Sequence, residues 1–168
     1  MDRHDKILIA VDETDASLAA VRYVGRMMGG RKDLHVRLFH VLPSTPPELL
    51  EYGGAEDPRR ERQLSAELQA AQAEWIAKAK RSAQASLEAT LVLLIDHGLL
   101  SENLSTELSS SIHKPDVARE VWEAAQKWDC GTIVTGRHSL PWTQELFHRH
   151  VSEELIRRAK GFTVWVVE

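Results

Sequence analysis

The stretch Ile7-Leu8-Ile9-Ala10-Val11-Asp12 decides the fold class, because five apolar residues in a row end abruptly at an acidic one. A continuous apolar run of this length is typical of a strand that is buried on both faces of a parallel sheet. The polar segment that follows turns the chain. Apolar residues at helical spacing then predict a helix that ends at Gly29-Gly30.

The rest of the chain continues this alternation of strands and helices. Further strands are predicted at 34–42, 103–112, 132–135 and 162–167, and further helices at 60–96, 115–128 and 151–160. The helix at 60–96 is long enough that we expect a bend or a split within it. The inward-facing residues of the last helix are predicted to be Val151, Leu155, Ile156 and Ala159.

The order βαβαβαβαβ implies a parallel sheet with right-handed crossovers and helices on both faces. No repeat or linker divides the chain, so residues 1–168 are expected to form a single domain. Within it, residues 43–59 are predicted to be a flexible insertion rich in Pro and Gly. Its composition is compatible with disorder and with a loop that binds a protein partner.

Composition excludes several classes of function. The formal net charge of -4 gives no electrostatic reason to expect a nucleic-acid partner. No apolar stretch approaches the roughly 20 residues of a membrane span, and the N-terminus does not have the pattern of a signal peptide. The lone Cys130 cannot form an intramolecular disulfide, so we expect a cytoplasmic protein without a membrane partner.

Motifs of catalysis are also missing from the sequence. It contains no phosphate-binding P-loop, no Gly-x-Gly-x-x-Gly and no nucleophile elbow, so an enzyme is not expected. His148 and His150 are two residues apart and lack acidic or thiol partners nearby, so no metal site is expected. Cys130 is predicted to be a buried small apolar residue, and His40 a packed or hydrogen-bonded one.

In open α/β sheets a ligand binds beyond the carboxyl ends of the strands, where the strand order reverses. Two segments fit that position: the one after Val11-Asp12, and the one from Gly136 onward. Together with their neighbours they form an ordered series of motifs that resembles the universal stress protein family. The series consists of Ile7 to Asp12, His40-Val41-Leu42-Pro43, Pro115-Asp116, Ile133-Val134-Thr135-Gly136, Val151-Ser152-Glu153-Glu154 and Thr163 to Val167.

The resemblance implies a five-stranded parallel sheet in the order 3-2-1-4-5, of the adenine nucleotide alpha hydrolase-like type, and commonly a homodimer. It also implies that Asp12 and Val41 lie around the adenosine part of a nucleotide. From the residues alone, Asp12 is as readily explained as a cap of the first helix or turn. The two roles of Asp12 are compatible.

Family members that bind ATP carry Gly-x-x-Gly, nine residues, and then Gly followed by Ser or Thr. In this sequence Gly136 fills the first position, whereas Ser139, Arg149 and His150 replace the other three, and Val151-Ser152 keep the pattern beyond them. Side chains at these positions restrict the close backbone approach that a phosphate nest needs. The loop is nevertheless rich in Arg and His, which attract phosphate by charge.

The sequence therefore favours a non-enzymatic, homodimeric stress-response protein with a degenerate nucleotide loop and no certain cofactor. Its predicted dimer interface is the apolar strand at 162–167, expected at a sheet edge. The alternative is an ATP- or AMP-binding member that acts as a nucleotide-dependent switch.

Overall fold

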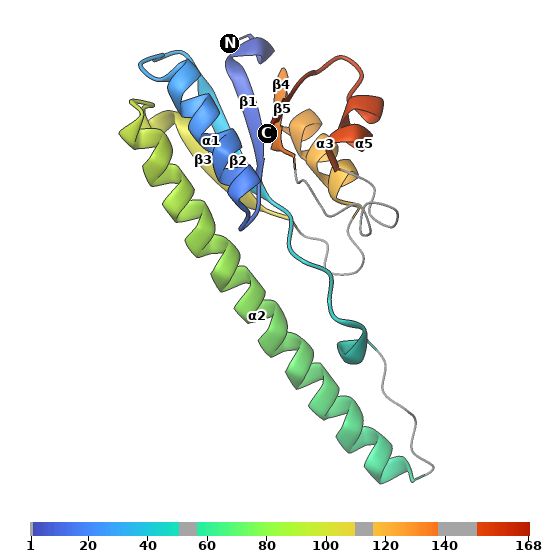
Figure 1. Ribbon diagram of the computed structural model, residues 1–168. Coiled ribbons are helices and arrows are strands. Elements are labelled where there is room, and N and C mark those ends of the chain that lie inside the picture. The colour runs from blue at the N-terminus through green and yellow to red at the C-terminus, as the bar shows by residue number, and fades with distance from the viewer. Residues whose placement is uncertain (1, 51–56, 110–115, 138–150) are drawn as a thin grey trace.

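The computed structural model describes residues 2–50, 57–109, 116–137 and 151–168 (Figure 1). Five parallel strands form one sheet in the order β3-β2-β1-β4-β5, which confirms the predicted fold class. The strands are β1 Lys6–Val11, β2 His35–His40, β3 Leu104–Leu108, β4 Thr132–Gly136 and β5 Thr163–Val167.

The apolar run that opened the sequence is the central strand. Strand β1 pairs with β2 on one side and with β4 on the other, and Ile7, Leu8 and Ile9 are buried. Since side chains alternate between the faces of a strand, Leu8 packs into one core and its two neighbours into the other. A strand with a core on each face requires this unbroken apolar sequence.

In the described part of the chain, two helices cover each face of the sheet (Figure 1). Helices α1, Asp15–Met28, and α2, Pro58–Asp96, pack on one face, and helices α3, Val117–Lys127, and α5, Val151–Arg158, on the other. The α3 helix begins at Asp116, whose side chain accepts a hydrogen bond from the Arg119 backbone N–H. The predicted opening residue Pro115 lies outside the described residues.

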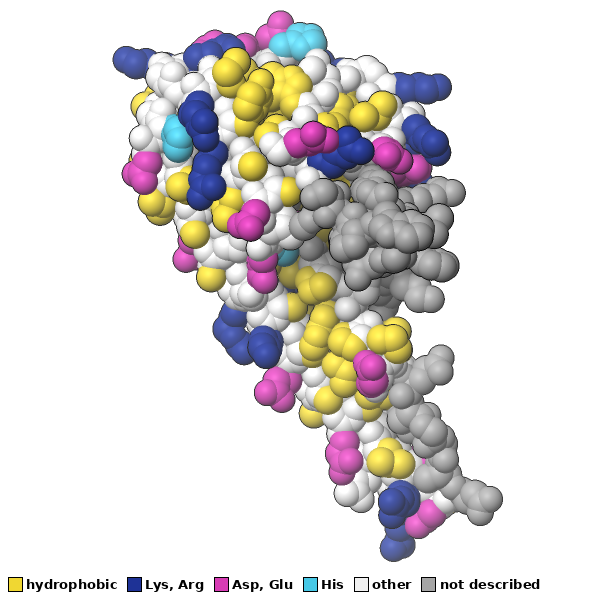
Figure 2. All heavy atoms as spheres, viewed as in Figure 1, with side chains coloured by type: hydrophobic (Ala, Val, Ile, Leu, Met, Phe, Trp, Pro, Cys, Tyr) yellow, Lys and Arg dark blue, Asp and Glu magenta, His cyan; other side chains and the backbone are white. Residues whose placement is uncertain are grey.

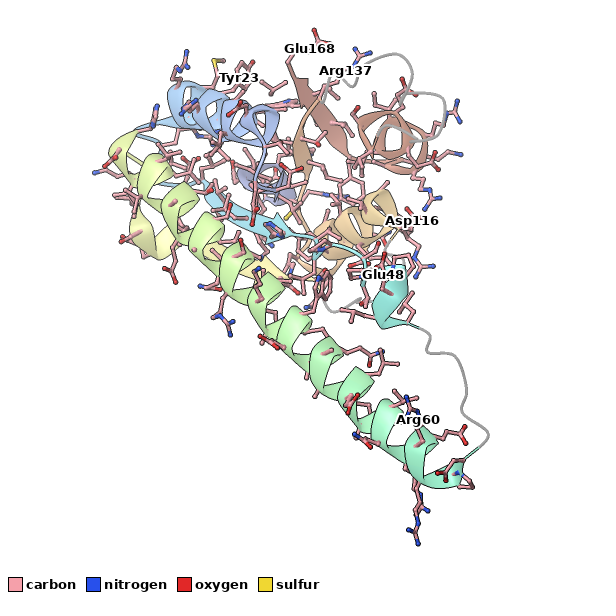
Figure 3. The ribbon with its side chains drawn as sticks, turned by 60° about the horizontal axis from the view of Figure 1, so that its bottom comes forward. Tyr23, Glu48, Arg60, Asp116, Arg137 and Glu168 are labelled. Carbon is pink, nitrogen blue, oxygen red and sulfur yellow. The ribbon has the colours of Figure 1, made fainter. Side chains whose placement is uncertain are left out.

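Helix α2 is one continuous helix of 39 residues, so the expected split does not occur. The reason lies in its sequence, which has no Gly and no Pro after Pro58. Its buried residues, Ala83, Leu87, Thr90 and Leu94, all belong to its second half. Its first half projects beyond the sheet (Figure 1), with Arg60 near the far end (Figure 3). Hydrophobic side chains gather over this projecting part (Figure 2).

The predicted insertion 43–59 is more ordered than expected in its described part. Residues Pro47–Leu49 form a 3-10 helix, η2, and the Gln72 side-chain amide on α2 donates a hydrogen bond to the Leu49 carbonyl. The last residues of the predicted insertion, from Pro58, already belong to α2, which Asp57 caps. The prediction of flexibility for 51–56 falls outside the described residues.

Two other expectations from the sequence need correction. The strand predicted at 103–112 ends at Leu108, follows the 3-10 helix η3, Ser101–Asn103, and has its last predicted residues outside the described ones. Ile156 was expected to face inward, yet its side chain is 61% exposed. Val151, Leu155 and Ala159 recur every four residues and share one face of α5, whereas Ile156 lies about 100° away from Leu155.

Candidate functional site

A hollow of about 390 Å³ lies at the carboxyl ends of β1 and β2, with α2 as its outer wall. This is the end of the sheet at which open α/β proteins bind their ligands. Strand ends supply polar groups and α2 supplies an aromatic and a cationic one. The lining residues are Asp12, Glu13, His40, Val41, Pro43, Trp75, Lys78, Ala79 and Ser82.

Hydrogen bonds fix the turn after β1, which carries Asp12. The Asp12 carboxylate accepts hydrogen bonds from the Thr14 backbone N–H, at 2.9 Å, and from the Thr14 hydroxyl. The Asp12 backbone N–H donates to the Ser17 hydroxyl at 3.0 Å. Helix α1 itself is capped by Thr14, so Asp12 orders the turn and does not cap the helix.

The second strand end is held just as firmly, which positions Val41. The Ser109 backbone N–H donates to the His40 carbonyl at 2.9 Å, and the Ser109 hydroxyl accepts from the Leu42 backbone N–H at 2.9 Å. On the α2 side, the Ser82 hydroxyl donates to the Glu13 carboxylate. The hollow therefore has a wall that is tied to the turn after β1.

His40 is the buried polar residue of this hollow. Its side chain is 4% exposed, and neither ring nitrogen has a hydrogen bond among the described residues. Burial lowers the pKa of His40 and outweighs the opposite effect of Asp12 and Glu13. His40 is packed, as predicted.

The described residues that were expected around a phosphate do not line this hollow. Gly136 ends β4, where an added Cβ would stand 2.3 Å from the Ala16 carbonyl oxygen, so packing against α1 alone explains this glycine. Val151 and Ser152 form the first turn of α5, with Ser152 buried. Ser139, Arg149 and His150 lie outside the described residues. The hollow thus brings together Asp12 and Val41, and its lining does not include Gly136, Val151 or Ser152.

Arg137 belongs to the cationic loop of the sequence, but its charge is engaged at the chain terminus. Its guanidinium donates a hydrogen bond to the Glu168 carboxylate at 2.8 Å, and its backbone N–H donates to the Val167 carbonyl at 2.7 Å. Figure 3 shows the two side chains together beyond the carboxyl ends of β4 and β5. An exposed pair of this kind is weak, yet it directs Arg137 toward the end of β5.

Trp75 and Lys78 of α2 are among the lining residues that sequence analysis missed. Trp75 falls in the apolar stripe of a long amphipathic helix, where such a residue ordinarily contacts only the core. A signal was available in the length of the helix, which exceeds what a five-residue strand such as β3 needs for its cover.

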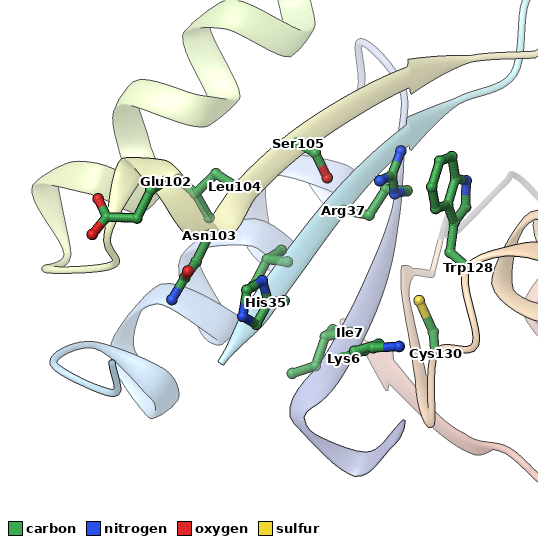
Figure 4. Close-up of a pocket in the computed structure, with 11 residues that line it drawn as sticks. Lys6, Ile7, His35, Arg37, Glu102, Asn103, Leu104, Ser105, Trp128 and Cys130 are labelled. Carbon is green, nitrogen blue, oxygen red and sulfur yellow. The ribbon is translucent and has the colours of Figure 1, made fainter. Parts of the chain in front are cut away.

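A second hollow, of about 370 Å³, lies at the amino ends of β1, β2 and β3 (Figure 4). Two of its charged side chains are already paired: Lys6 lies 3.4 Å from Asp129, and Arg37 lies 3.5 Å from Glu107. The Arg37 guanidinium also stacks 3.3 Å from the Trp128 ring centroid. Burial raises the pKa of the Cys130 thiol to about 11, which keeps it protonated. We therefore assign this hollow a structural role.

Among the described residues, no three His, Cys, Asp or Glu side chains form a group that could hold a metal ion. In the same part of the chain, no helix combines the length and the apolar sequence that a membrane crossing requires.

The parallel sheet in the order 3-2-1-4-5, with its crevice at the carboxyl strand ends, defines the class as adenine nucleotide alpha hydrolase-like. The sequence matches the Universal stress protein family over residues 3–168, and the chain belongs to that family. No curated protein sequence is significantly similar to it.

Several solved structures share this fold. A universal stress protein family member from Burkholderia pseudomallei is 16% identical, with a TM-score of 0.61 over 99% of this chain and 98% of that one. The universal stress protein from Archaeoglobus fulgidus in complex with dAMP is 18% identical, with a TM-score of 0.54 over 97% of each chain. A family protein from Arabidopsis thaliana with AMP bound is 16% identical, with a TM-score of 0.59 over 96% of this chain and 90% of that one.

Proposed function

We propose that this universal stress protein is a non-enzymatic, nucleotide-dependent switch that binds an adenine nucleotide in the hollow beside α2. The observation that carries the proposal is the composition of this hollow, because Asp12 and Val41 line it together with the aromatic Trp75. A concave site with an apolar wall and a few polar groups suits a nucleoside. This hollow is the reason for preferring the nucleotide-binding alternative to a protein without a ligand.

The two ends of a nucleotide are expected to be held unequally. At the nucleoside end, the exposed Asp12 carboxylate suits the ribose hydroxyls, since it accepts their hydrogen bonds. The structures from Archaeoglobus fulgidus and Arabidopsis thaliana, in complex with dAMP and AMP, support the ligand class. At the phosphate end, Ser139, Arg149 and His150 replace small residues, so a tight main-chain nest around a triphosphate is not expected.

Calorimetric titration with ATP, ADP and AMP tests the proposal. We expect micromolar binding that Asp12→Ala weakens by about tenfold, the loss of one or two hydrogen bonds to a charged group. The matched control is Asp15→Ala, an exposed aspartate three residues further along that does not line the hollow. Incubation with ATP should release no phosphate above the buffer rate. Absence of binding by all three nucleotides, or steady hydrolysis, overturns the proposal.

A second proposal, homodimerisation through β5, is supported by the position of this strand. Strand β5 is an edge of the sheet and pairs with β4 alone, so one side of its backbone is open to another strand. Tyr23 of α1, 42% exposed, packs edge-to-face on Trp165 of β5 and extends this apolar edge. Sedimentation at micromolar concentration should give twice the 19.0 kDa mass of one chain, and a clean monomer rejects the dimer.

A further inference from the structure

The wall of the hollow that α2 supplies has a defined chemistry. Trp75, Lys78 and Ala79 are spaced i, i+3 and i+4, so they share one helix face, and all three line the hollow. Trp75 is half-buried although it lies in the helix half without buried residues. Its ring therefore offers a flat apolar surface beside the strand ends, of the kind on which nucleobases stack.

His40 faces the same hollow from the end of β2. A neutral imidazole has one hydrogen-bond donor and one acceptor, and His40 uses neither among the described residues. A buried polar group without a partner destabilises the fold. A heteroaromatic ligand edge with an acceptor or a donor satisfies one of the two nitrogens, because these point away from each other on the ring, and a purine edge carries both kinds of group.

The described charges of the hollow suit one phosphate group. Its lining, as described, carries two exposed carboxylates, Asp12 and Glu13, and the exposed ammonium of Lys78. The two carboxylates oppose further negative charge near Lys78, although solvent weakens this repulsion. One phosphate group, paired with one lysine, is compatible with this balance.

We infer that the hollow selects a purine nucleoside monophosphate through side chains and not through a main-chain phosphate loop. In this assignment the base stacks on Trp75 and hydrogen-bonds to His40, while Lys78 pairs with the phosphate. The inference rests on the proposed function, and it adds the residues that read the base and the number of phosphates.

The test is a titration of wild type and variants with AMP, adenosine and ATP. Trp75→Ala should raise the AMP Kd by about tenfold or more, which corresponds to the binding free energy of one base–aromatic stack. Trp75→Phe keeps an aromatic ring and should retain most of the affinity. His40→Leu should weaken AMP and adenosine alike, and His40→Asn, which keeps a donor and an acceptor, should recover part of the loss. Each variant is first checked for a wild-type thermal transition.

Lys78 provides the test of phosphate number. Lys78→Ala should raise the Kd of AMP several-fold and leave that of adenosine unchanged. The matched control is Lys80→Ala, an exposed lysine of α2 outside the hollow that should alter neither. Wild type should bind ATP no more tightly than AMP.

The outcomes distinguish a failure of the proposed function from a failure of the side-chain assignment. If wild type binds none of the three ligands, the proposed function fails. If it binds AMP but Trp75→Phe, Trp75→Ala and both His40 variants bind equally well, the proposed function stands and the side-chain assignment is wrong. If ATP binds at least tenfold more tightly than AMP, the preference for a monophosphate is wrong.

Discussion

At the scale of single residues, buried polar groups in this protein differ in whether the fold supplies their partners. Glu107 on β3 accepts hydrogen bonds from the Lys127 ammonium, at 2.8 Å, and from the Trp128 indole, and it lies 3.5 Å from Arg37. His40 on β2 has no such partner among the described residues. Satisfied groups stabilise a fold, so Glu107 belongs to a structural cluster, whereas His40 lines the hollow and keeps hydrogen-bonding capacity that a ligand can use.

His40 should make stability depend on pH. Burial holds its pKa below the value of about 6.5 found in an unfolded chain, so between the two values only the unfolded chain binds the proton. Stability is therefore complete above pH 6.5 and falls as the pH drops below it. We expect His40→Leu to reduce this loss of stability. Urea titrations at pH 7.5 and at pH 5 measure it, because these values lie on either side of the unfolded pKa of about 6.5. The same change at exposed His4 is the control, and equal slopes for wild type and His40→Leu contradict the prediction.

Glu107 should contribute to stability through its hydrogen bonds. Glu107→Ala leaves Trp128 and Arg37 without their acceptor, and we expect the free energy of unfolding to fall by about 1–3 kcal/mol. Glu107→Gln, which still accepts from the indole, should cost less. The control is Glu123→Ala, because the exposed Glu123–Arg119 pair contributes little. A loss at Glu107 no greater than at Glu123 refutes the prediction.

Glu107 should also make stability depend on pH, but at lower pH than His40. Burial alone would raise the pKa of Glu107, but the hydrogen bonds from Lys127 and Trp128 outweigh it, and the pKa is lowered. The unfolded chain therefore takes up this proton first as the pH falls below about 4.5. The stability that Glu107 contributes is present above that pH and is lost on further acidification.

At the scale of elements, α2 combines two functions in one helix. Its second half packs on β2 and β3 through Leu87 and Leu94, and its first half carries Trp75 and Lys78 beyond the strand ends. A helix of 39 residues is about 58 Å long at 1.5 Å per residue, far more than a five-residue strand requires. Because α2 extends beyond the sheet, the same helix both packs on the sheet and forms one wall of the hollow.

The two halves of α2 should therefore respond differently to the same substitution. Leu87 is fully buried, so Leu87→Ala should lower the free energy of unfolding by about 2–5 kcal/mol. Leu64 is only half-buried on the projecting half, and Leu64→Ala should cost clearly less. Equal losses in chemical denaturation would mean that the projecting half is packed as tightly as the rest of α2.

At the scale of the whole molecule, the sheet order places β5 and β3 at the two edges. One face of β3 is covered by α2 and the face of β5 is covered by α1, but strand edges are satisfied only by another strand. The difference between the edges lies in their sequences: Thr163-Val164-Trp165-Val166-Val167 is apolar, whereas Leu104-Ser105-Thr106-Glu107-Leu108 is mostly polar. Pairing of two copies is therefore expected at β5.

Val166→Asp should weaken that pairing. A carboxylate at a half-buried position of the edge strand would have to be desolvated in the dimer, but can reach water in the monomer. Sedimentation should show a dimer for wild type and dissociation for the variant, with the circular dichroism of the sheet retained. Thr106→Asp, on the opposite edge, is the control and should leave the dimer intact. A Val166→Asp protein that stays dimeric places the interface elsewhere.

Local sequence determined the order and the type of the elements. The apolar run at β1, the helical stripes and the turn residues act over a few positions, and each of them specifies its own structure without distant contacts. For the same reason Asp12 and Val41 could be named, since both directly follow or end a strand at the edge where ligands bind. The predicted end of the helix at residue 96 also agrees with α2, because a glycine follows shortly after it, and Gly98 adopts a φ of +90° that favours glycine.

Only the tertiary structure decided what stands opposite those strand ends. Trp75 is separated from Asp12 by more than 60 residues, and the apolar stripe of α2 does not indicate how far the helix extends past the sheet. The burial of His40 without a hydrogen-bond partner, and the close approach of Gly136 to Ala16, also arise from elements distant in sequence. The sequence alone determined each helix and strand, because the interactions that form these elements are local. The hollow and the balance of charges in it depend on how the elements pack, which no local pattern encodes.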